Sequence, residues 1–112
     1  VCYLIWNDPY MTAGGDTFIS DMLCKAGFRN MFQQQQRYPQ VSINEIKNSG
    51  AEIILLSSEP YPFKEKHKKE IQQLLPGKKV LFADGEMFSW YGSRMLLAPE
   101  YFAKLHQQIN QT

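Results

Sequence analysis

Eight aromatic side chains gather in four short segments of this chain, and aromatic rings grouped in loops suit the binding of a bulky or flat ligand. The segments are residues 6–14, 33–39, 57–63 and 83–93, and each follows a short apolar run. Loops that leave the carboxyl ends of parallel strands collect along one edge of a sheet, where ligands bind. The sequence therefore predicts an aromatic-lined binding rim containing Trp6, Tyr10, Tyr38, Tyr61, Phe63, Phe88, Trp90 and Tyr91.

The polar residues near these segments form no recognised catalytic or metal-binding pattern. Ser57 and Ser58 stand at a predicted strand end, but no G-x-S-x-G turn surrounds them and no histidine lies in the rim segments. His67 and His106 have no partner at a known metal-ligand spacing. These patterns argue against hydrolase chemistry and a protein metal site, and they imply no cofactor.

Residues 14–17 read Gly-Gly-Asp-Thr between a predicted strand and a predicted helix, so they could cradle a phosphate. They lack the G-x-G-x-x-G spacing and a P-loop lysine, which favours a tight turn with a helix cap. Arg94 stands at the start of the last predicted helix, where a cation opposes the helix dipole. Two interpretations of Arg94 have equal weight, namely contact with a ligand anion and pairing with a local acid such as Glu86.

The composition is that of a globular domain and does not point to nucleic acid. The chain has 112 residues, of which 44% are hydrophobic and 21% charged, and its net charge is +1. The basic run at residues 64–70 includes two glutamates and lies on a predicted amphipathic helix, which favours a solvated helix face. No apolar run reaches the roughly 18 residues needed to span a bilayer.

Short apolar runs at residues 1–5, 53–56 and 80–82 predict buried strands, and residues 30–32 predict a fourth, very short one. Ser42 and Glu45 form a capping box that starts a short helix ending near Asn48. Pro99 predicts a kink or a second start near Ala98 in the last helix. The other helices are expected at residues 17–26, 62–75 and 93–110.

This alternation of strands and helices predicts a single domain, a three-layer α-β-α lobe with a mostly parallel sheet of about four strands. Cys2 and Cys24 are expected to be small buried residues, and a disulfide between them stays open. The chain begins inside its first predicted strand, so we expect it to be a fragment whose lack of a signal peptide says nothing about compartment.

The order of several motifs resembles the C-terminal lobe of the periplasmic binding proteins that serve ABC importers of iron–siderophores, haem and vitamin B12. Those proteins have two α/β lobes joined by one long helix. Each motif is weak alone, but the ordered set covers nearly the whole chain and is fairly specific. The motifs are Trp6-Asn7-Asp8-Pro9 with Gly14 and Thr17-Phe18-Ile19, Ala26-Gly27-Phe28-Arg29-Asn30, Arg37-Tyr38-Pro39-Gln40-Val41-Ser42, Ala51-Glu52-Ile53-Ile54-Leu55-Leu56 and Tyr91-Gly92-Ser93-Arg94.

The resemblance implies binding without catalysis. The ligand, an iron–siderophore, haem or cobalamin, would lie between this lobe (residues 1–112) and an N-terminal lobe that, like the linking helix, is absent from the chain. A membrane permease would be the protein partner, and the location would be periplasmic or otherwise extracytoplasmic, with a membrane-anchored lipoprotein as one form. The ligand contacts implied by the family are Trp6, Tyr10, Tyr38, Met87, Trp90, Tyr91 and Arg94.

The resemblance also implies a docking contact with the permease. In the family, a glutamate two residues after the Val-Ser pair docks onto permease arginines. Here that position is Asn44 and the glutamate falls at Glu45, so both are docking candidates. Glu45 has the alternative role of capping its helix and nothing more.

Two other function classes stay open on the sequence. A small α/β enzyme or phospho-ligand domain would use Gly14-Gly15 and Arg94, with a base among Asp8, Asp16, Glu59, Asp84 and Glu86. A response-regulator-like interaction module would need clustered acids at strand ends, for which Asp84 alone is insufficient. An isolated lobe would also expose its half of the cleft, so we expect it to self-associate.

Overall fold

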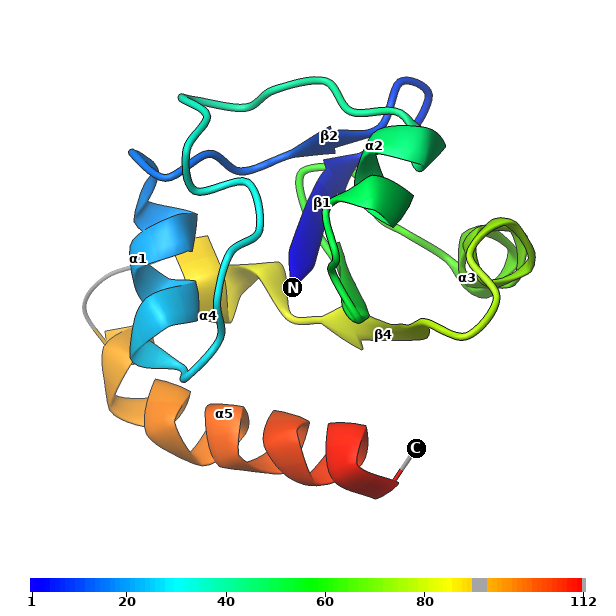
Figure 1. Ribbon diagram of the computed structural model, residues 1–112. Helices are drawn as coiled ribbons and strands as arrows, with labels where there is room; N and C mark the ends of the chain where they lie inside the picture. The colour runs from blue at the N-terminus through cyan, green and yellow to red at the C-terminus, as the bar shows by residue number, and fades with distance from the viewer. Residues whose placement is uncertain (90–92, 112) are drawn as a thin grey trace.

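A computed structural model describes residues 1–89 and 93–111. Four strands form one sheet in the order β2-β1-β3-β4 (Figure 1). Strands β1 (Cys2–Trp6), β3 (Ile53–Ser57) and β4 (Lys79–Ala83) are parallel, and β2 (Met11–Thr12) pairs antiparallel with β1 at the edge. The mostly parallel sheet predicted from the apolar runs is confirmed.

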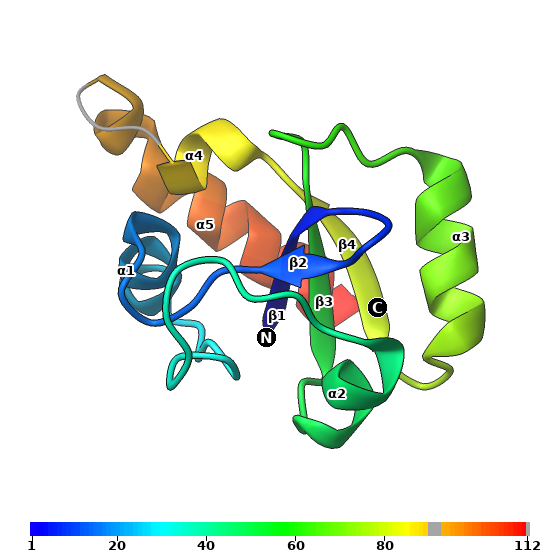
Figure 2. The same ribbon diagram turned by 90° about the horizontal axis from the view of Figure 1, so that it is seen from above.

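Helices cover both faces of this sheet (Figure 2). Helices α1 (Phe18–Lys25), α4 (Gly85–Ser89) and α5 (Ser93–Gln111) lie on one face, and α2 (Ile43–Asn48) and α3 (Glu65–Leu74) lie on the other. Because each face of the sheet is apolar, each needs its own layer of helices. The predicted three-layer α-β-α lobe is therefore confirmed.

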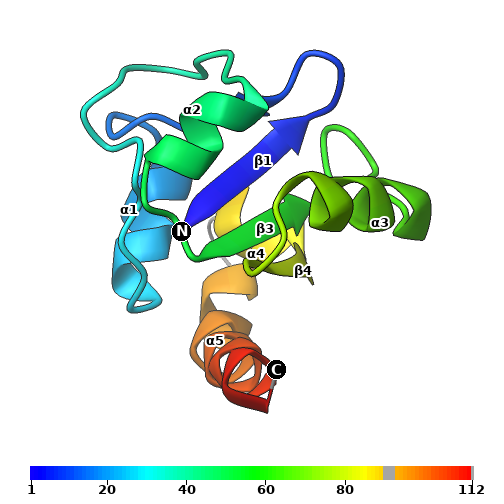
Figure 3. The ribbon, with the colours of Figure 1, turned by 45° about the vertical axis from the view of Figure 1, so that its right-hand side comes forward.

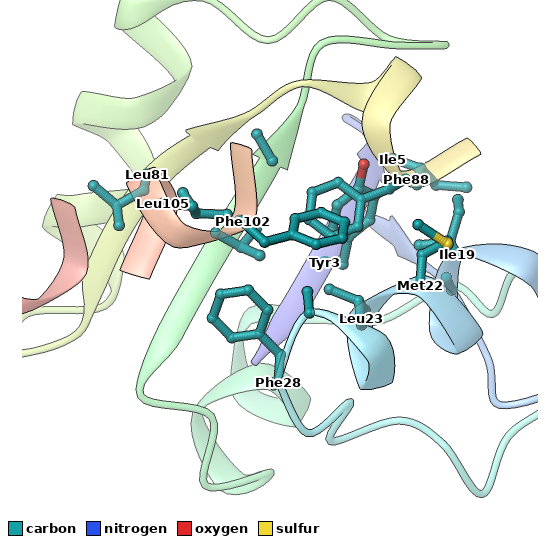
Figure 4. Close-up of a cluster of buried hydrophobic side chains, with 14 of the residues drawn as sticks. Tyr3, Ile5, Ile19, Met22, Leu23, Phe28, Leu81, Phe88, Phe102 and Leu105 are labelled. Carbon is teal, nitrogen blue, oxygen red and sulfur yellow. The ribbon is translucent and has the colours of Figure 1, made fainter. Parts of the chain in front are cut away.

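The parallel strands point the same way, so their carboxyl ends share one edge, as the arrowheads of β1 and β3 show in Figure 3. Alternate side chains of each strand enter two separate cores. Tyr3, Ile5, Leu55 and Leu81 face the core under α1, α4 and α5 (Figure 4). The other core, under α2 and α3, holds Cys2, Leu4, Ile54, Leu56 and Val80.

The fourth strand is not the one predicted. Residues 30–32 form a turn, and the edge strand β2 comes from the first rim segment. The reason lies in Asn30, which is buried and uses its side chain to bond the backbone of Ala13 and Phe32 and the hydroxyl of Ser20. Such side-chain bonds to nearby backbone compete with strand pairing.

The helix starts agree with their capping signals. Thr17 accepts a hydrogen bond from the Ser20 N–H, and Ser42 and Glu45 complete the predicted capping box. One predicted bound is wrong, because α3 begins at Glu65 and not at residue 62. Of the two alternatives expected at Pro99, the second start is not found, since α5 continues through this residue as one helix.

Residues 33–39 do not follow a strand but run beside residues 12–16. The N–H groups of Thr12, Gly14 and Gly15 donate to the carbonyls of residues 39, 37 and 35, at 3.1, 2.7 and 2.8 Å. A Cβ on Gly14 or Gly15 would come within 2.4 or 1.9 Å of a carbonyl oxygen in this segment. These glycines therefore allow two backbone segments to approach closely, and their N–H groups already donate to carbonyl oxygens. This confirms the interpretation of residues 14–17 as a turn and not as a phosphate cradle.

The two cysteines differ in environment, and both are free thiols. Cys2 is buried in β1, and burial raises the pKa of its thiol to about 12. Cys24 is exposed on α1, so its predicted burial is wrong. It lies just off the inward stripe of α1, which Ile19, Met22 and Leu23 form.

A buried hydroxyl network joins β1 to the end of β3. The Tyr3 hydroxyl donates to Ser57 Oγ at 3.1 Å, and Ser57 Oγ donates to the Glu59 carbonyl at 2.6 Å. Ser57 Oγ also accepts from the Glu59 N–H at 3.2 Å. Tyr3 and Ser57 are both 0% exposed, so neither hydroxyl can turn to water instead.

We expect Gly15→Ala to lower the free energy of unfolding by about 3 kcal/mol, because the new methyl group would overlap the Gln33 carbonyl. Gly77→Ala is the matched control. Gly77 has a φ of +88° but no neighbouring atom within 4 Å, so only backbone strain of about 1 kcal/mol applies. Urea unfolding of both variants measures the difference, and equal losses would contradict the close approach at Gly15.

We expect Ser57→Ala to cost about 2–3 kcal/mol of unfolding free energy, because it leaves the buried Tyr3 hydroxyl without its partner. Tyr3→Phe should cost about 1 kcal/mol, since Ser57 keeps its bonds to Glu59. The double variant should cost less than the sum of the two losses. Strictly additive losses in a thermal or urea unfolding cycle would show that the two hydroxyls are not coupled.

Candidate ligand-binding site

Three of the four aromatic segments meet at the carboxyl edge of the parallel strands. The loop after β1 joins the loop after β3 through the Asn7 side-chain amide, which donates to the Tyr61 hydroxyl at 3.3 Å. The loop after β3 joins the end of β4 through Ser58, whose N–H donates to the Ala83 carbonyl at 3.0 Å. Ser58 Oγ in turn accepts from the Gly85 N–H at 2.8 Å.

An aromatic cluster occupies the junction of the first two loops. The Trp6 and Tyr61 ring centroids are 5.4 Å apart in an edge-to-face contact. Tyr61 also contacts Phe63 at 5.0 Å and His67 at 5.2 Å. Trp6 is 40% exposed whereas Phe63 and His67 are buried, so the cluster presents one indole ring to solvent and supports it from below.

His67 connects this cluster to the start of α3. The Lys64 backbone N–H donates to His67 Nδ1 at 2.8 Å, and His67 Nε2 lies 2.8 Å from the Tyr61 hydroxyl. Because a backbone N–H can only donate, Nδ1 is the acceptor and the ring proton resides on Nε2. Both ring nitrogens are therefore engaged within the protein.

The segment after β4 was expected to be a loop, but Gly85–Ser89 form α4, and the start of this segment packs tightly against the end of β3. A Cβ on Gly85 would lie 2.7 Å from Ser57 Oγ and 2.6 Å from a side-chain carbon of Glu59. The Asp84 N–H donates to the Tyr101 hydroxyl of α5 at 2.7 Å. Burial raises the pKa of Tyr101, which keeps this hydroxyl protonated near neutral pH.

The residues expected to contact ligand occupy different environments. Trp6 is exposed at the rim. Tyr10 is half-buried against the core under α2 and α3, and burial raises its pKa. Met87 is half-buried against the opposite core. Trp90 and Tyr91 lie outside the described residues, and of Arg94 the structure describes only its backbone place in the first turn of α5.

Tyr38 is 45% exposed but does not stand at a strand end. It belongs to the segment beside residues 12–16, where the Asp16 carboxylate accepts from the Arg37 N–H at 2.6 Å. Arg37 has a φ of +60°, a conformation that this bond helps to hold. Within residues 1–89, no ring contact joins Tyr38 to Trp6.

The docking candidates lie in the first turn of α2. Asn44 and Glu45 are both exposed. Glu45 Oε1 accepts from the Ser42 N–H at 3.1 Å, so part of this carboxylate is engaged in the capping box.

Sequence reasoning missed the roles of Asn7 and His67, and it placed Tyr61 in the rim without including it among the ligand contacts. The only local signal is the position of His67 in the first turn of α3, where a side chain can reach back to the N-terminal N–H groups. The charged residues described in the three joined loops are all acidic, namely Asp8, Glu59, Asp84 and Glu86. Among the described residues, no three acidic, histidine or cysteine side chains are placed to hold a metal ion.

No described helix is long and apolar enough to cross a membrane. No protein-family model matches the sequence, and no curated protein matches it either. Solved structures do match it, and those described next are periplasmic binding proteins.

A possible iron-binding periplasmic solute-binding protein from Staphylococcus epidermidis has a TM-score of 0.73 at 22% identity, over 96% of this chain and 43% of its own. The vitamin B12 binding protein BtuF of Vibrio cholerae has a TM-score of 0.70 at 18% identity, and the match covers 99% of this chain and 45% of BtuF. The haem-binding protein HutB of Vibrio cholerae has a TM-score of 0.69 at 15% identity, and the match covers 96% of this chain and 46% of HutB.

This chain thus spans less than half the length of each of these proteins. Identities this low establish a common fold and leave ligand and partners to be argued from the site. The chain has the fold of one lobe of the periplasmic binding proteins for iron, haem and vitamin B12, which confirms the resemblance indicated by its motifs.

Proposed function

We propose that this chain is the C-terminal lobe of a two-lobed substrate-binding protein. That protein would be located outside the cytoplasm and would deliver its ligand to an ABC importer in the membrane. The observation that carries the proposal is the exposed Trp6 ring at the carboxyl edge of the sheet, supported from below by Tyr61 and His67. Ligands of open α/β sheets bind at this edge. A second lobe would supply the opposite wall of the cleft.

The ligand proposed is a metal chelate or corrinoid, that is an iron–siderophore, haem or cobalamin. Aromatic faces suit such bulky or flat molecules, because they offer large apolar area with few rotatable bonds. Trp6 and Tyr38 have the exposure that this role requires. The remaining proposed contacts are Tyr10, Met87, Trp90, Tyr91 and Arg94.

Binding without catalysis is supported by the state of the strand-end hydroxyls. Ser57 Oγ is buried and fully engaged with Tyr3 and Glu59, so it is not available as a nucleophile. A phospho-ligand is disfavoured because the Gly14 and Gly15 N–H groups already bond carbonyls.

Replacement of Trp6 or Tyr38 by Ala in the full-length protein should weaken binding of its chelate by about tenfold or more, because each removes an exposed aromatic face. Haemin, cyanocobalamin and ferrichrome serve as probes in calorimetric or fluorescence titrations. Arg94→Ala tests the proposed anion contact in the same assay.

Leu74→Ala is the matched control for these variants. Leu74 is 49% exposed, but it precedes β4 and so lies towards the opposite edge of the sheet. Affinity should not change in this variant. If the wild-type protein binds none of the probes, or if Trp6→Ala and Tyr38→Ala bind as well as Leu74→Ala, the site assignment is wrong.

We also propose that the exposed end of α2, with Asn44 and Glu45, docks on the permease. Glu45→Gln is the sharpest test, because Gln retains the oxygen that accepts the Ser42 N–H while it removes the charge. Uptake or stimulated ATPase activity of the reconstituted importer should fall several-fold, with an unchanged melting temperature. An unchanged transport rate would assign Glu45 to helix capping alone, and Asn44→Glu would then show whether the neighbouring position can dock.

A further inference from the structure

Tyr61 lies between the exposed and the buried parts of the aromatic cluster. Its ring contacts Trp6 at 5.4 Å on the outer side and His67 at 5.2 Å on the inner side. Trp6 is 40% exposed, His67 is 6% exposed and Tyr61 itself is half-buried. Tyr61 is therefore the polar side chain directly behind the surface on which we place the ligand.

The oxygen of the Tyr61 hydroxyl accepts two hydrogen bonds, one from His67 and one from Asn7. His67 Nδ1 accepts from the Lys64 N–H at 2.8 Å, so Nε2 carries the proton and donates it to Tyr61 at 2.8 Å. The Asn7 side-chain amide donates to the same oxygen at 3.3 Å. A phenol has two acceptor positions and one proton, so these bonds use its acceptor capacity and leave its proton for donation.

We propose that Tyr61 donates this proton in a hydrogen bond to an oxygen of the bound ligand and thereby determines specificity, with His67 and Asn7 as positioning residues. This inference rests on the proposed function of the same edge. The two donors fix the direction of the hydroxyl group, and hydrogen bonds received by the oxygen strengthen the one that it donates. The site would then be preorganised before the ligand arrives.

This arrangement defines the chemistry of the ligand more closely. A molecule that stacks on Trp6 and bonds Tyr61 needs an apolar face with an acceptor oxygen at its border, such as a peripheral carboxylate or amide. A donor that the bound ligand covers discriminates strongly against an analogue that lacks the acceptor, because the donor is then left unpaired. Suitable ligands would thus share an acceptor oxygen at the border of their apolar face, whether or not they carry the same metal.

The first test is Tyr61→Phe in the full-length protein, with haemin, cyanocobalamin and ferrichrome as probes. The Phe ring keeps the contacts with Trp6 and Phe63, and only the hydroxyl is lost. Affinity for the probe that the wild type binds should fall about tenfold. Equal affinity in Tyr61→Phe, with a loss in Trp6→Ala, would overturn this inference and leave the proposed function intact. Failure of the wild type to bind any probe would overturn both.

The second test asks whether His67 directs the Tyr61 proton. In His67→Glu, a carboxylate can accept from the Lys64 N–H as in a capping box, but it would also accept the Tyr61 proton and withdraw it from the ligand. Affinity should fall as in Tyr61→Phe, and the double variant should fall no further. His67→Gln keeps one acceptor and one donor, so it should bind like the wild type. Full affinity in a folded His67→Glu would overturn the positioning role, and if that variant does not fold, Tyr61→Phe decides.

Discussion

The geometry of the binding edge depends on one buried hydroxyl group, that of Tyr3. The Tyr3 ring is buried in the core, with its centroid 5.1 Å from that of the Phe88 ring. The hydroxyl must therefore bond a partner inside the protein. It bonds Ser57, the last residue of β3, whose own hydroxyl holds the backbone of Glu59. Gly85 then packs against the same place. A group within the core therefore determines where two of the rim loops begin, independently of contacts at the surface.

The rigidity of the exposed surface follows from what lies beneath it. Trp6 rests on Tyr61, and Tyr61 is bonded to His67, which is itself held by the first turn of α3. A ring supported in this way has little conformational freedom to lose on binding. Under the proposed function, this surface would form one firm wall of the cleft.

The buried strands, the helix caps and the edge at which the rim forms could be predicted from sequence, because each depends on residues close together in the chain. The place of residues 33–39 could not, since distant backbone groups hold this polar segment and leave no periodic signal. The prediction that Cys24 is buried was wrong, because successive side chains of a helix differ in direction by about 100°. Cys24 follows the buried Leu23 and therefore points away from the core. The roles of Asn7 and His67 required the meeting of two loops that only the fold brings about.

The manner in which residues 33–39 are held has a consequence for how this lobe can be altered. Three hydrogen bonds from residues 12–15 reach this segment through its carbonyl groups, and the Asp16 carboxylate reaches it through an N–H. The side chains of Gln33, Gln34, Gln35, Gln36 and Tyr38 are exposed and contribute nothing to that attachment. Substitutions of these exposed side chains should therefore cost little folding free energy, whereas Gly14 and Gly15 cannot be replaced without a steric clash. Under the proposed function, this segment could thus be adapted to a different ligand without a change in the backbone that holds it.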